Sequence, residues 1–408
     1  MTSLRLLLAS APVPALPSLI VRLGLHDQFL LEESEGFRMD VVGRTVSQVK
    51  GDPGLSHSAR DRYGLGVLVD PDSWRNQWPV EDRPISFQKA AFASRVTLDL
   101  QKRPLSAAEE DAYVRATLEE EVAARASIFV PPYHVAGGPD CRIRGLDLRL
   151  ARRTVARVKA LRLDEPRTRE RFPKTGEVFV CVCLRANELS DPIARNMLAH
   201  LYSQVEADGY LLKVAGLSEH SPNAHVRVVA DFAFTLKVLT GRSVVLVGGK
   251  NLGYAFVAGG LDAAMLGIGE GETFSPAARA RGGGVRAVYH SPILRNVQTY
   301  GAAVSGLFRS EILFARYPCS CGHHPMGRAP EGQRERKLHT LSERLADFNT
   351  AAAWNATDAR QRLAARIAEA NQVAEATGYP ALPDTFLAVV DQAELARRRW
   401  LRTGEQPF

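Results

Sequence analysis

The sequence has no long apolar segment. Apolar residues gather at positions 4–8 and 16–21, but Pro12, Pro14 and Pro17 interrupt this region. A secretory signal needs an unbroken apolar core of about 7–15 residues, and a membrane-spanning helix needs about 20. The sequence therefore predicts neither, and we expect a cytoplasmic protein without a membrane partner.

Cysteine is scarce, with five residues among 408. Cys181 and Cys183 form one Cys-x-Cys pair, and Cys319 and Cys321 form another. So few cysteines do not support the disulfide framework of a small secreted domain. Cys181 and Cys183 alternate along a predicted strand and point to the same side, which predicts two buried core thiols.

A glycine signature for nucleotide binding is also absent from the early part of the chain. No Gly-x-Gly-x-x-Gly opens an early helix. Gly248-Gly249-Lys250 resembles a small anion-binding turn, but it lacks the Walker spacing. The open doubly wound sheet, which is the main alternative fold, therefore lacks its usual support.

Histidines follow the second Cys-x-Cys pair. His324 lies three residues after Cys321, and His339 lies further on. Two thiolates and two imidazoles are ligand types of tetrahedral zinc, and four protein ligands leave no position for a substrate. The set Cys319, Cys321, His324 and His339 therefore predicts a structural zinc ion that joins a helical tail to the rest of the fold. His323 can replace His324, and free thiols with loop histidines are the alternative.

Short runs rich in Val, Leu and Ile alternate with segments of helix length. The clearest runs lie within residues 65–72, 127–134, 177–188, 208–219, 243–250 and 260–270. This alternation predicts a parallel sheet, and over this length a TIM-type (β/α)8 barrel with a zinc-binding insertion and a C-terminal helical region. We predict an N-terminal β-rich segment that joins the barrel (1–62), the barrel itself (63–316), and a zinc site with a helical tail (317–408).

Carboxylates follow two of the predicted strands. Asp70 and Asp72 close the first clear run, and Glu270 lies in a glycine-rich sequence at the end of the last one. The carboxyl ends of barrel strands are where catalytic groups lie. If Asp70 and Asp72 face the same side, their repulsion raises the pKa of one of them toward general acid or base work. A turn or a helix cap is the alternative for Asp-Pro-Asp.

Positive charge is concentrated in two places. The formal net charge is +7, with a dense basic run between residues 142 and 174 and an arginine cluster at 397–402. Such clusters suit phosphate backbones, which supply most sequence-independent affinity for nucleic acids. A solvated arginine-rich helix face is the alternative. The predicted contacts to a nucleic-acid backbone are Arg149, Arg152, Arg153, Arg157 and Lys159.

Several motifs share the order and spacing of a known family. They are Leu68-Val69-Asp70, Asp208-Gly209-Tyr210, Gly216-Leu217-Ser218-Glu219, Leu246-Val247-Gly248-Gly249, Gly260-Leu261-Asp262 and the Cys/His set at 319–339. Over residues 63–350 the chain resembles the tRNA-guanine transglycosylase superfamily, which includes relatives that insert 7-deazaguanines into DNA. The resemblance implies that Asp70 acts in acid/base chemistry and that the backbone of residues 216–219 binds the base.

Three departures from the family change the implied chemistry. The family's Gly-Val-Asp-x-x-Asp carries the covalent nucleophile as its second Asp, and Met265 stands at that position. Methionine cannot attack a sugar, so the covalent intermediate of base exchange cannot form in the usual way. Arg185-Ala186-Asn187-Glu188 replaces the base-recognition turn, and a histidine replaces the third zinc cysteine. Asp262 lies at the start of its strand, where we expect a structural role.

The resemblance and the missing nucleophile together imply hydrolysis of an N-glycosidic bond. One carboxylate can activate water against an oxocarbenium-like sugar, which predicts a DNA glycosylase that excises a modified base, leaves an abasic site and serves in defence against phages. Asp70 is the expected general base or electrostatic stabiliser, with Asp72 and Glu270 as secondary candidates. The residues expected to contact the base or substrate are Tyr133, Arg185, Asn187, Lys213, Gly216, Leu217, Ser218, Glu219, Gly248 and Gly249.

Three alternative functions stay open on the sequence. The chain can be a base-exchanging transglycosylase that acts on DNA or tRNA. It can also be a non-catalytic, nucleic-acid-binding subunit of such an enzyme, with a homologue supplying the nucleophile. An unrelated barrel enzyme acting on a phosphorylated metabolite is the third. In the first two cases DNA is favoured over tRNA as the partner.

Overall fold

The fold is seen in a computed structural model. It describes residues 16–24, 27–37, 39–93, 104–136, 142–163, 176–268, 274, 287–299 and 304–403. The predicted site residue Glu270 lies outside these ranges, as does the apolar run at 4–8. Within them, no helix is long and apolar enough to cross a membrane.

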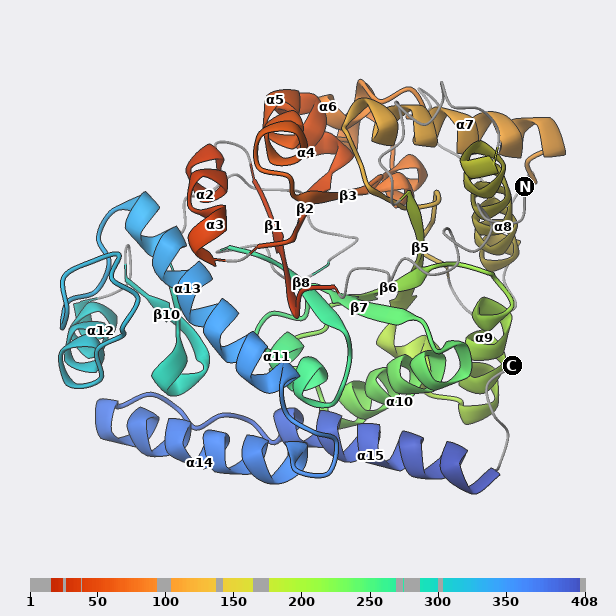
Figure 1. The fold of residues 1–408 in the computed structure, drawn as a ribbon. Coiled ribbons are helices and arrows are strands. Elements are labelled where there is room, and N and C mark those ends of the chain that lie inside the picture. Colours follow the sequence, from red (N-terminus) through yellow and green to blue (C-terminus); the bar gives the residue numbers. More distant parts are fainter. Residues whose placement is uncertain are drawn as a thin grey trace, which may run out of the picture.

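Eight parallel strands close a barrel in chain order, and β1 pairs with β8 to complete it (Figure 1). The strands are β1 Leu19–Arg22, β2 Val41–Thr45, β3 Gly66–Asp70, β4 Ile128–Phe129, β5 Glu177–Arg185, β6 Gly209–Ala215, β7 Ser243–Val247 and β8 Ala263–Gly267. This confirms the predicted (β/α)8 class. The first two strands come from residues 1–62, so the predicted boundary at residue 63 falls inside the barrel.

The strands are apolar on both sides because one side faces the helices and the other faces the barrel interior. β5 shows this most clearly, since it is buried from Glu177 to Leu184. Cys181 and Cys183 lie in the interior cluster of apolar side chains, together with Phe179. The two cysteines are therefore buried core thiols, as predicted, and burial raises the pKa of the Cys183 thiol to about 12.

Helices follow the strands around the outside of the barrel. They are α2 Gln28–Glu32, α3 Ser34–Phe37, α4 Val46–Gly51, α5 Pro53–His57, α6 Ile85–Gln88, α7 Ala107–Ala123, α8 Arg142–Leu163, α9 Pro192–Ser203, α10 Asn223–Thr240 and α11 Leu252–Ala258. Short turns of 3₁₀ or π-helix lie at Ser58–Arg62, Ser73–Gln77, Val80–Asp82, Ala186–Leu189 and Ser291–Ile293. A capping box starts α7, because Glu109 N–H donates to Ser106 Oγ at 3.3 Å while Glu109 Oε2 accepts from Ser106 N–H at 2.8 Å.

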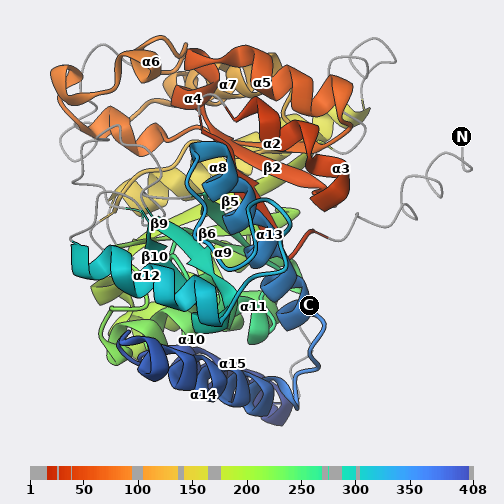
Figure 2. The same ribbon diagram turned by 90° about the vertical axis from the view of Figure 1, so that its left-hand side faces the viewer.

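An antiparallel hairpin and four helices follow the barrel. They are β9 Ala287–His290, β10 Arg295–Gln298, α12 Val304–Arg316, α13 Gln333–Ala352, α14 Ala359–Thr377 and α15 Thr385–Thr403. Figure 1 shows α14 and α15 one after the other along the bottom of the molecule, where both also lie in Figure 2, and the hairpin packs against α13. The predicted helical tail contains several helices, and the chain turns between α13 and α14 after Ala352.

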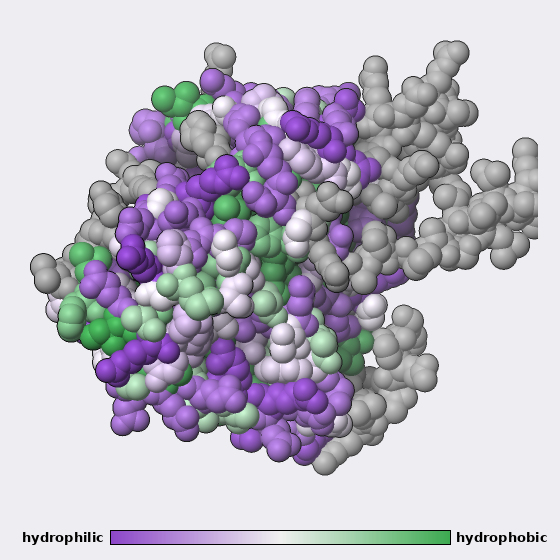
Figure 3. Space-filling model, turned by 60° about the vertical axis from the view of Figure 1, so that its left-hand side comes forward, coloured by the Kyte–Doolittle hydropathy of each residue, from purple (hydrophilic) through white to green (hydrophobic). Residues whose placement is uncertain are grey.

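The surface gives no sign of a large apolar patch among the described residues. Hydrophilic residues dominate the upper and lower parts of the face in Figure 3, and more apolar residues gather across its middle. The exposed large apolar side chains are Ile85, Ile193, Met197, Phe308, Met326 and Leu395. They are spread over four helices and one loop, which is ordinary for a folded protein surface.

Candidate functional site

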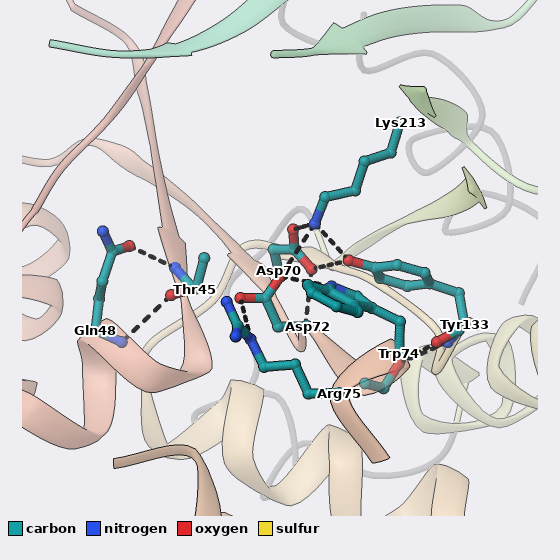
Figure 4. Close-up of polar contacts among 9 residues, drawn as sticks. Thr45, Gln48, Asp70, Asp72, Trp74, Arg75, Tyr133 and Lys213 are labelled. Carbon is teal, nitrogen blue, oxygen red and sulfur yellow. Dashed lines mark hydrogen bonds and ion pairs between the residues drawn. The ribbon is translucent and has the colours of Figure 1, made fainter. Parts of the chain in front are cut away.

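Four predicted residues, Asp70, Asp72, Tyr133 and Lys213, meet inside the barrel near the carboxyl ends of the strands (Figure 4). Asp70 is the last residue of β3, Tyr133 follows β4, and Lys213 lies in the second half of β6. Asp70 is 2% exposed and Lys213 is 3% exposed. A Lys–Asp pair buried in a barrel interior costs much more to desolvate than an exposed pair, so it survives only with good hydrogen bonds.

The ammonium group of Lys213 lies at the centre of this cluster. Its Nζ donates to Asp70 Oδ2 at 2.6 Å, to Asp72 Oδ1 at 3.0 Å and to the Tyr133 hydroxyl oxygen at 2.7 Å. An ammonium group has three hydrogens, so all of its donors are used. Burial alone lowers the pKa of Lys213, but Asp70 and Asp72 outweigh burial and raise this pKa above its usual value. Lys213 is therefore a fixed cation.

The carboxylate of Asp70 is held in one orientation. Its Oδ1 accepts from the Tyr133 hydroxyl at 2.6 Å and from the Asp72 backbone N–H at 2.9 Å, and its Oδ2 accepts from Lys213. Ser73 Oγ fixes Tyr133 in turn, because it bonds both the N–H and the C=O of that residue at 2.7 Å. A carboxylate accepts about four hydrogen bonds. Three described donors reach Asp70, which leaves an acceptor position on Oδ2.

Asp72 has a different environment from Asp70. Its backbone is left-handed, with φ at 51°, and its side chain accepts from Trp74 Nε1 at 3.2 Å and from Arg75 Nε at 3.4 Å in addition to Lys213. Burial raises the pKa of the Asp72 carboxyl, but Lys213 and Arg75 outweigh it and hold this pKa well below its usual range.

Asp70 and Asp72 both bond Lys213, and the Asp72 pKa is lowered and not raised. A cation separates the two carboxylates, so repulsion between them does not raise the Asp72 pKa. Asp72 stays an anion at neutral pH and cannot act as a general acid.

Aromatic rings line the site. Trp74 packs edge-on against Trp78 and against Phe274, with centroid distances of 4.8 and 5.3 Å. Arg75 lies over both indoles, and the Lys213 ammonium lies 4.9 Å from the centre of the Phe274 ring. Such contacts stabilise a cation next to an apolar wall.

Met265 lies in the barrel interior. It lies in β8 between Ile20 of β1 and Val247 of β7, and its side chain belongs to the interior cluster. A Cβ added to Gly43 of β2 would lie 2.5 Å from Met265 Sδ. Gly43 therefore makes room for the thioether, and this wall of the barrel is apolar.

The other predicted base-contacting residues lie at the end of β5, in the 3₁₀ turn that follows it, and on the loops after β6 and β7. Arg185 and Asn187 are exposed. Glu219 accepts from Asn251 Nδ2 at 3.3 Å, and Gly216 N–H donates to the backbone oxygen of Phe274 at 2.8 Å. The remaining members of this group are Leu217, Ser218, Gly248 and Gly249. They share the barrel end with Asp70, but no hydrogen bond joins them to it in the described residues.

Two site residues escaped the sequence reasoning altogether. Arg75 lies three residues after Asp72, and this spacing was a usable signal for an ion pair. Phe274 lies in a stretch without periodicity, so nothing in the sequence indicated it. Glu121 of α7 is a further buried acid. The Glu121 carboxyl is buried against the Val130 N–H at 2.7 Å, and burial raises its pKa well above the usual value.

The basic run on α8 is largely paired with acids. Arg149 and Arg153 both bond Glu110 of α7, at 2.8 and 2.9 Å, and Lys159 bonds Glu206 at 2.5 Å. Arg152 and Arg157, the other two predicted contacts in this run, are exposed. A barrel helix starts at the carboxyl ends of the strands and runs away from them, so Arg157 lies roughly 22 Å along the axis from the start of α8. The run therefore leads away from the candidate site.

Four side chains form a group that can hold a metal ion. The Cys319 and Cys321 thiols are 3.3 Å apart, Cys319 Sγ is 3.1 Å from His324 Nε2, and that nitrogen is 3.1 Å from His339 Nδ1. Ligands bound at about 2.0–2.3 Å to one tetrahedral ion stand roughly 3–4 Å apart, so the four atoms fit. His323 instead packs against the Phe37 ring at 5.4 Å, which decides between the two histidines.

Comparison with known proteins adds no family. No protein-family model matches the chain, and no curated protein matches it.

Proposed function

We propose that the protein is a DNA glycosylase that hydrolyses the N-glycosidic bond of a modified base and leaves an abasic site. One observation carries the proposal. Asp70 is a buried, oriented carboxylate with an acceptor position on Oδ2, in a barrel where Met265 fills the place of a second carboxylate. The resemblance to base-exchanging barrels supports it. A cytoplasmic role in defence against phages with modified DNA follows from the same reasoning.

The chemistry needs one carboxylate. Cleavage of a glycosidic bond passes through an oxocarbenium-like sugar, whose positive charge a nearby carboxylate stabilises. Asp70 Oδ2 holds the water that attacks C1′ and accepts its proton, while the base leaves with the electron pair of the broken C–N bond and takes a proton from solvent. Lys213 and Tyr133 keep the Asp70 carboxylate in place throughout.

The aromatic wall suits a base turned out of the duplex. Glycosylases hold the flipped base between aromatic or apolar side chains. Trp74, Trp78 and Phe274 supply such surfaces beside the Asp70–Lys213 pair. Exchange is disfavoured because Met265 offers no nucleophile and because three donors already hold Asp70.

The metal group is proposed as a structural zinc site. Cys319, Cys321, His324 and His339 would hold the ion, and four protein ligands leave no open coordination position for a substrate. Bound zinc would supply a crosslink between the loop after α12 and helix α13. None of these residues contacts Asp70 or Lys213 in the described structure, so the ion has no part in the proposed hydrolysis.

A non-catalytic nucleic-acid-binding subunit is the second candidate. The observation that favours it is the near-complete burial of Asp70 and Lys213, at 2% and 3% exposure. Residues this deeply buried can stabilise the barrel interior without taking part in catalysis.

The test is an assay for abasic sites in duplex DNA that carries modified bases, with the full-length protein alone. We expect the wild type to form abasic sites and Asp70→Asn to be slower by at least about 100-fold, the usual weight of a positioned acid or base. Asp262→Asn is the matched control, since Asp262 forms a Lys–Asp pair with Lys237 at the opposite end of the barrel. An active Asp70→Asn protein would remove Asp70 from the mechanism, and binding without cleavage would favour the subunit.

A further inference from the structure

One ring nitrogen of His339 belongs to the metal group, and the other does not. The ring is fully buried on α13, and its Nδ1 lies 3.1 Å from His324 Nε2. Its other nitrogen, Nε2, is buried without a hydrogen-bond partner among the described residues. Buried polar atoms nearly always have a partner, so this nitrogen needs an explanation.

His290 lies next to His339, with the two ring centroids 5.8 Å apart. It ends β9, is fully buried, and its Nε2 lies 2.9 Å from the backbone oxygen of Tyr317. A carbonyl oxygen only accepts, so Nε2 carries the hydrogen, and Nδ1 of the neutral ring that burial favours is a bare acceptor. This Nδ1 also has no hydrogen-bond partner in the described structure.

Glu343 lies near the two histidines, one helical turn after His339 on α13. Its Oε2 accepts from the Ser291 N–H at 2.9 Å and lies 3.9 Å from His290 Nδ1. One nitrogen of each imidazole and one oxygen of Glu343 lie within 4.8 Å of one another. His290 Nδ1 and the Glu343 carboxylate are therefore two acceptors close to each other and to the His339 ring, and His290 Nδ1 lacks a donor.

His339 supplies that donor once a metal is bound. A metal on Nδ1 takes the lone pair of that nitrogen, so the hydrogen of the neutral ring is on Nε2. We propose that His290 and Glu343 are the outer shell of the metal site, where they accept the His339 Nε2–H and hold Nδ1 toward the ion. This inference rests on the proposed metal and is independent of the proposed glycosylase activity.

His290 also contacts the segment that carries the two cysteines. Tyr317 stands two residues before Cys319, and its carbonyl is bound by the same His290 ring that faces His339. His290 and Glu343 are thus positioning residues, which act on the ion through His339. Outer-shell partners of this kind typically change metal affinity by about 10–100-fold.

The experiment measures zinc release from the full-length, zinc-loaded protein to a chelator, with zinc content per chain measured in parallel. His290→Gln keeps an N–H for the Tyr317 carbonyl but removes the acceptor near Nδ1. His290→Asn does the reverse, because its amide oxygen lies near the Nδ1 position. Glu343→Gln keeps the bond from Ser291 with a weaker, neutral acceptor.

Asp347→Asn is the matched control. Asp347 lies one turn beyond Glu343 on the same helix and binds the same hairpin, through Tyr289 Oη at 2.8 Å and Ser291 Oγ at 3.0 Å. It therefore shares the packing role of Glu343, while the buried group around His339 does not include it. A purely structural effect would appear equally in Asp347→Asn.

We expect zinc release to be about 10–100-fold faster in His290→Gln, about tenfold faster in Glu343→Gln, and close to wild type in His290→Asn and Asp347→Asn. Equal acceleration in Asp347→Asn, or no acceleration in any variant, would overturn the proposal. Two zinc ions per wild-type chain, with one lost in Glu343→Gln, would also overturn it, because His290 and Glu343 would then be ligands of a second ion. If the His290 variants do not fold, Glu343→Gln and Asp347→Asn decide alone.

Discussion

Removing the buried cation at the centre of the candidate site tests the electrostatic reasoning most directly. Lys213→Met keeps much of the side-chain volume but leaves Asp70 and Asp72 buried without the ammonium that bonds them at 2.6 and 3.0 Å. Breaking a buried ion pair by deleting one partner costs about 3–5 kcal/mol. We expect a loss in this range at pH 7.5, even though Tyr133, Trp74 and Arg75 continue to bond the carboxylates.

The pH dependence of this loss has a definite sign. The Asp72 pKa is lowered in the folded protein, so its contribution to stability is present above the unfolded value of about 3.9 and is lost as the pH falls through the lowered pKa. The Lys213 pKa is raised, so its contribution is lost only as the pH rises through that higher value. The wild-type pair should thus contribute constantly from about pH 5 to 9.

In Lys213→Met the carboxylates lose their compensating charge, so burial favours their protonated forms. The deficit in unfolding free energy should therefore grow as the pH rises from about 4.5 to 7.5. Urea unfolding followed by tryptophan fluorescence measures it. Lys237→Met is the control, because its pair with Asp262 is partly exposed, at 31% and 27%, and such pairs contribute about 0–1 kcal/mol. A deficit below about 1 kcal/mol, or one equal at both pH values, would refute the reasoning.

Three further outcomes are expected. Gly43→Ala should lower the free energy of unfolding by about 1–3 kcal/mol, because its Cβ overlaps Met265 Sδ, and the same change in a Met265→Ala background should cost less in urea unfolding. Cys183 should stay unreactive toward a thiol reagent at pH 8 in the folded protein, since burial raises its pKa to about 12, and a fast reaction would place it outside the core. Arg157→Gln should leave DNA affinity and its salt dependence unchanged, because α8 carries it away from the site; a salt slope reduced by about one would make it a phosphate contact.

The barrel could be predicted because apolar runs of strand length alternate with helices. The sequence pattern was least clear for β1, β2 and β4. β4 has only two residues, Ile128 and Phe129, and its place depends on its neighbours β3 and β5 and not on its own pattern. Local sequence carries little information where tertiary pairing decides the structure.

The candidate site was partly predictable for a similar reason. Asp70 and Tyr133 follow apolar runs, and Lys213 is the one charged residue of a buried strand, which marked each as unusual. Their meeting was not predictable, since Lys213 and Asp70 are 143 residues apart and touch only because the barrel closes. Sequence spacing predicted the Cys/His group better, because three of its four members lie within six residues.

Barrel closure has a consequence for the order in which the chain can fold during synthesis. β1 pairs with β2 on one side, but its other edge stays open until β8 has been made, and an open strand edge invites wrong pairing. Ser18, just before β1, also bonds Asn349 of α13 at 2.7 Å. A nascent chain that has passed Lys213 therefore contains the whole Asp70 cluster in its sequence and still lacks the barrel that would assemble it.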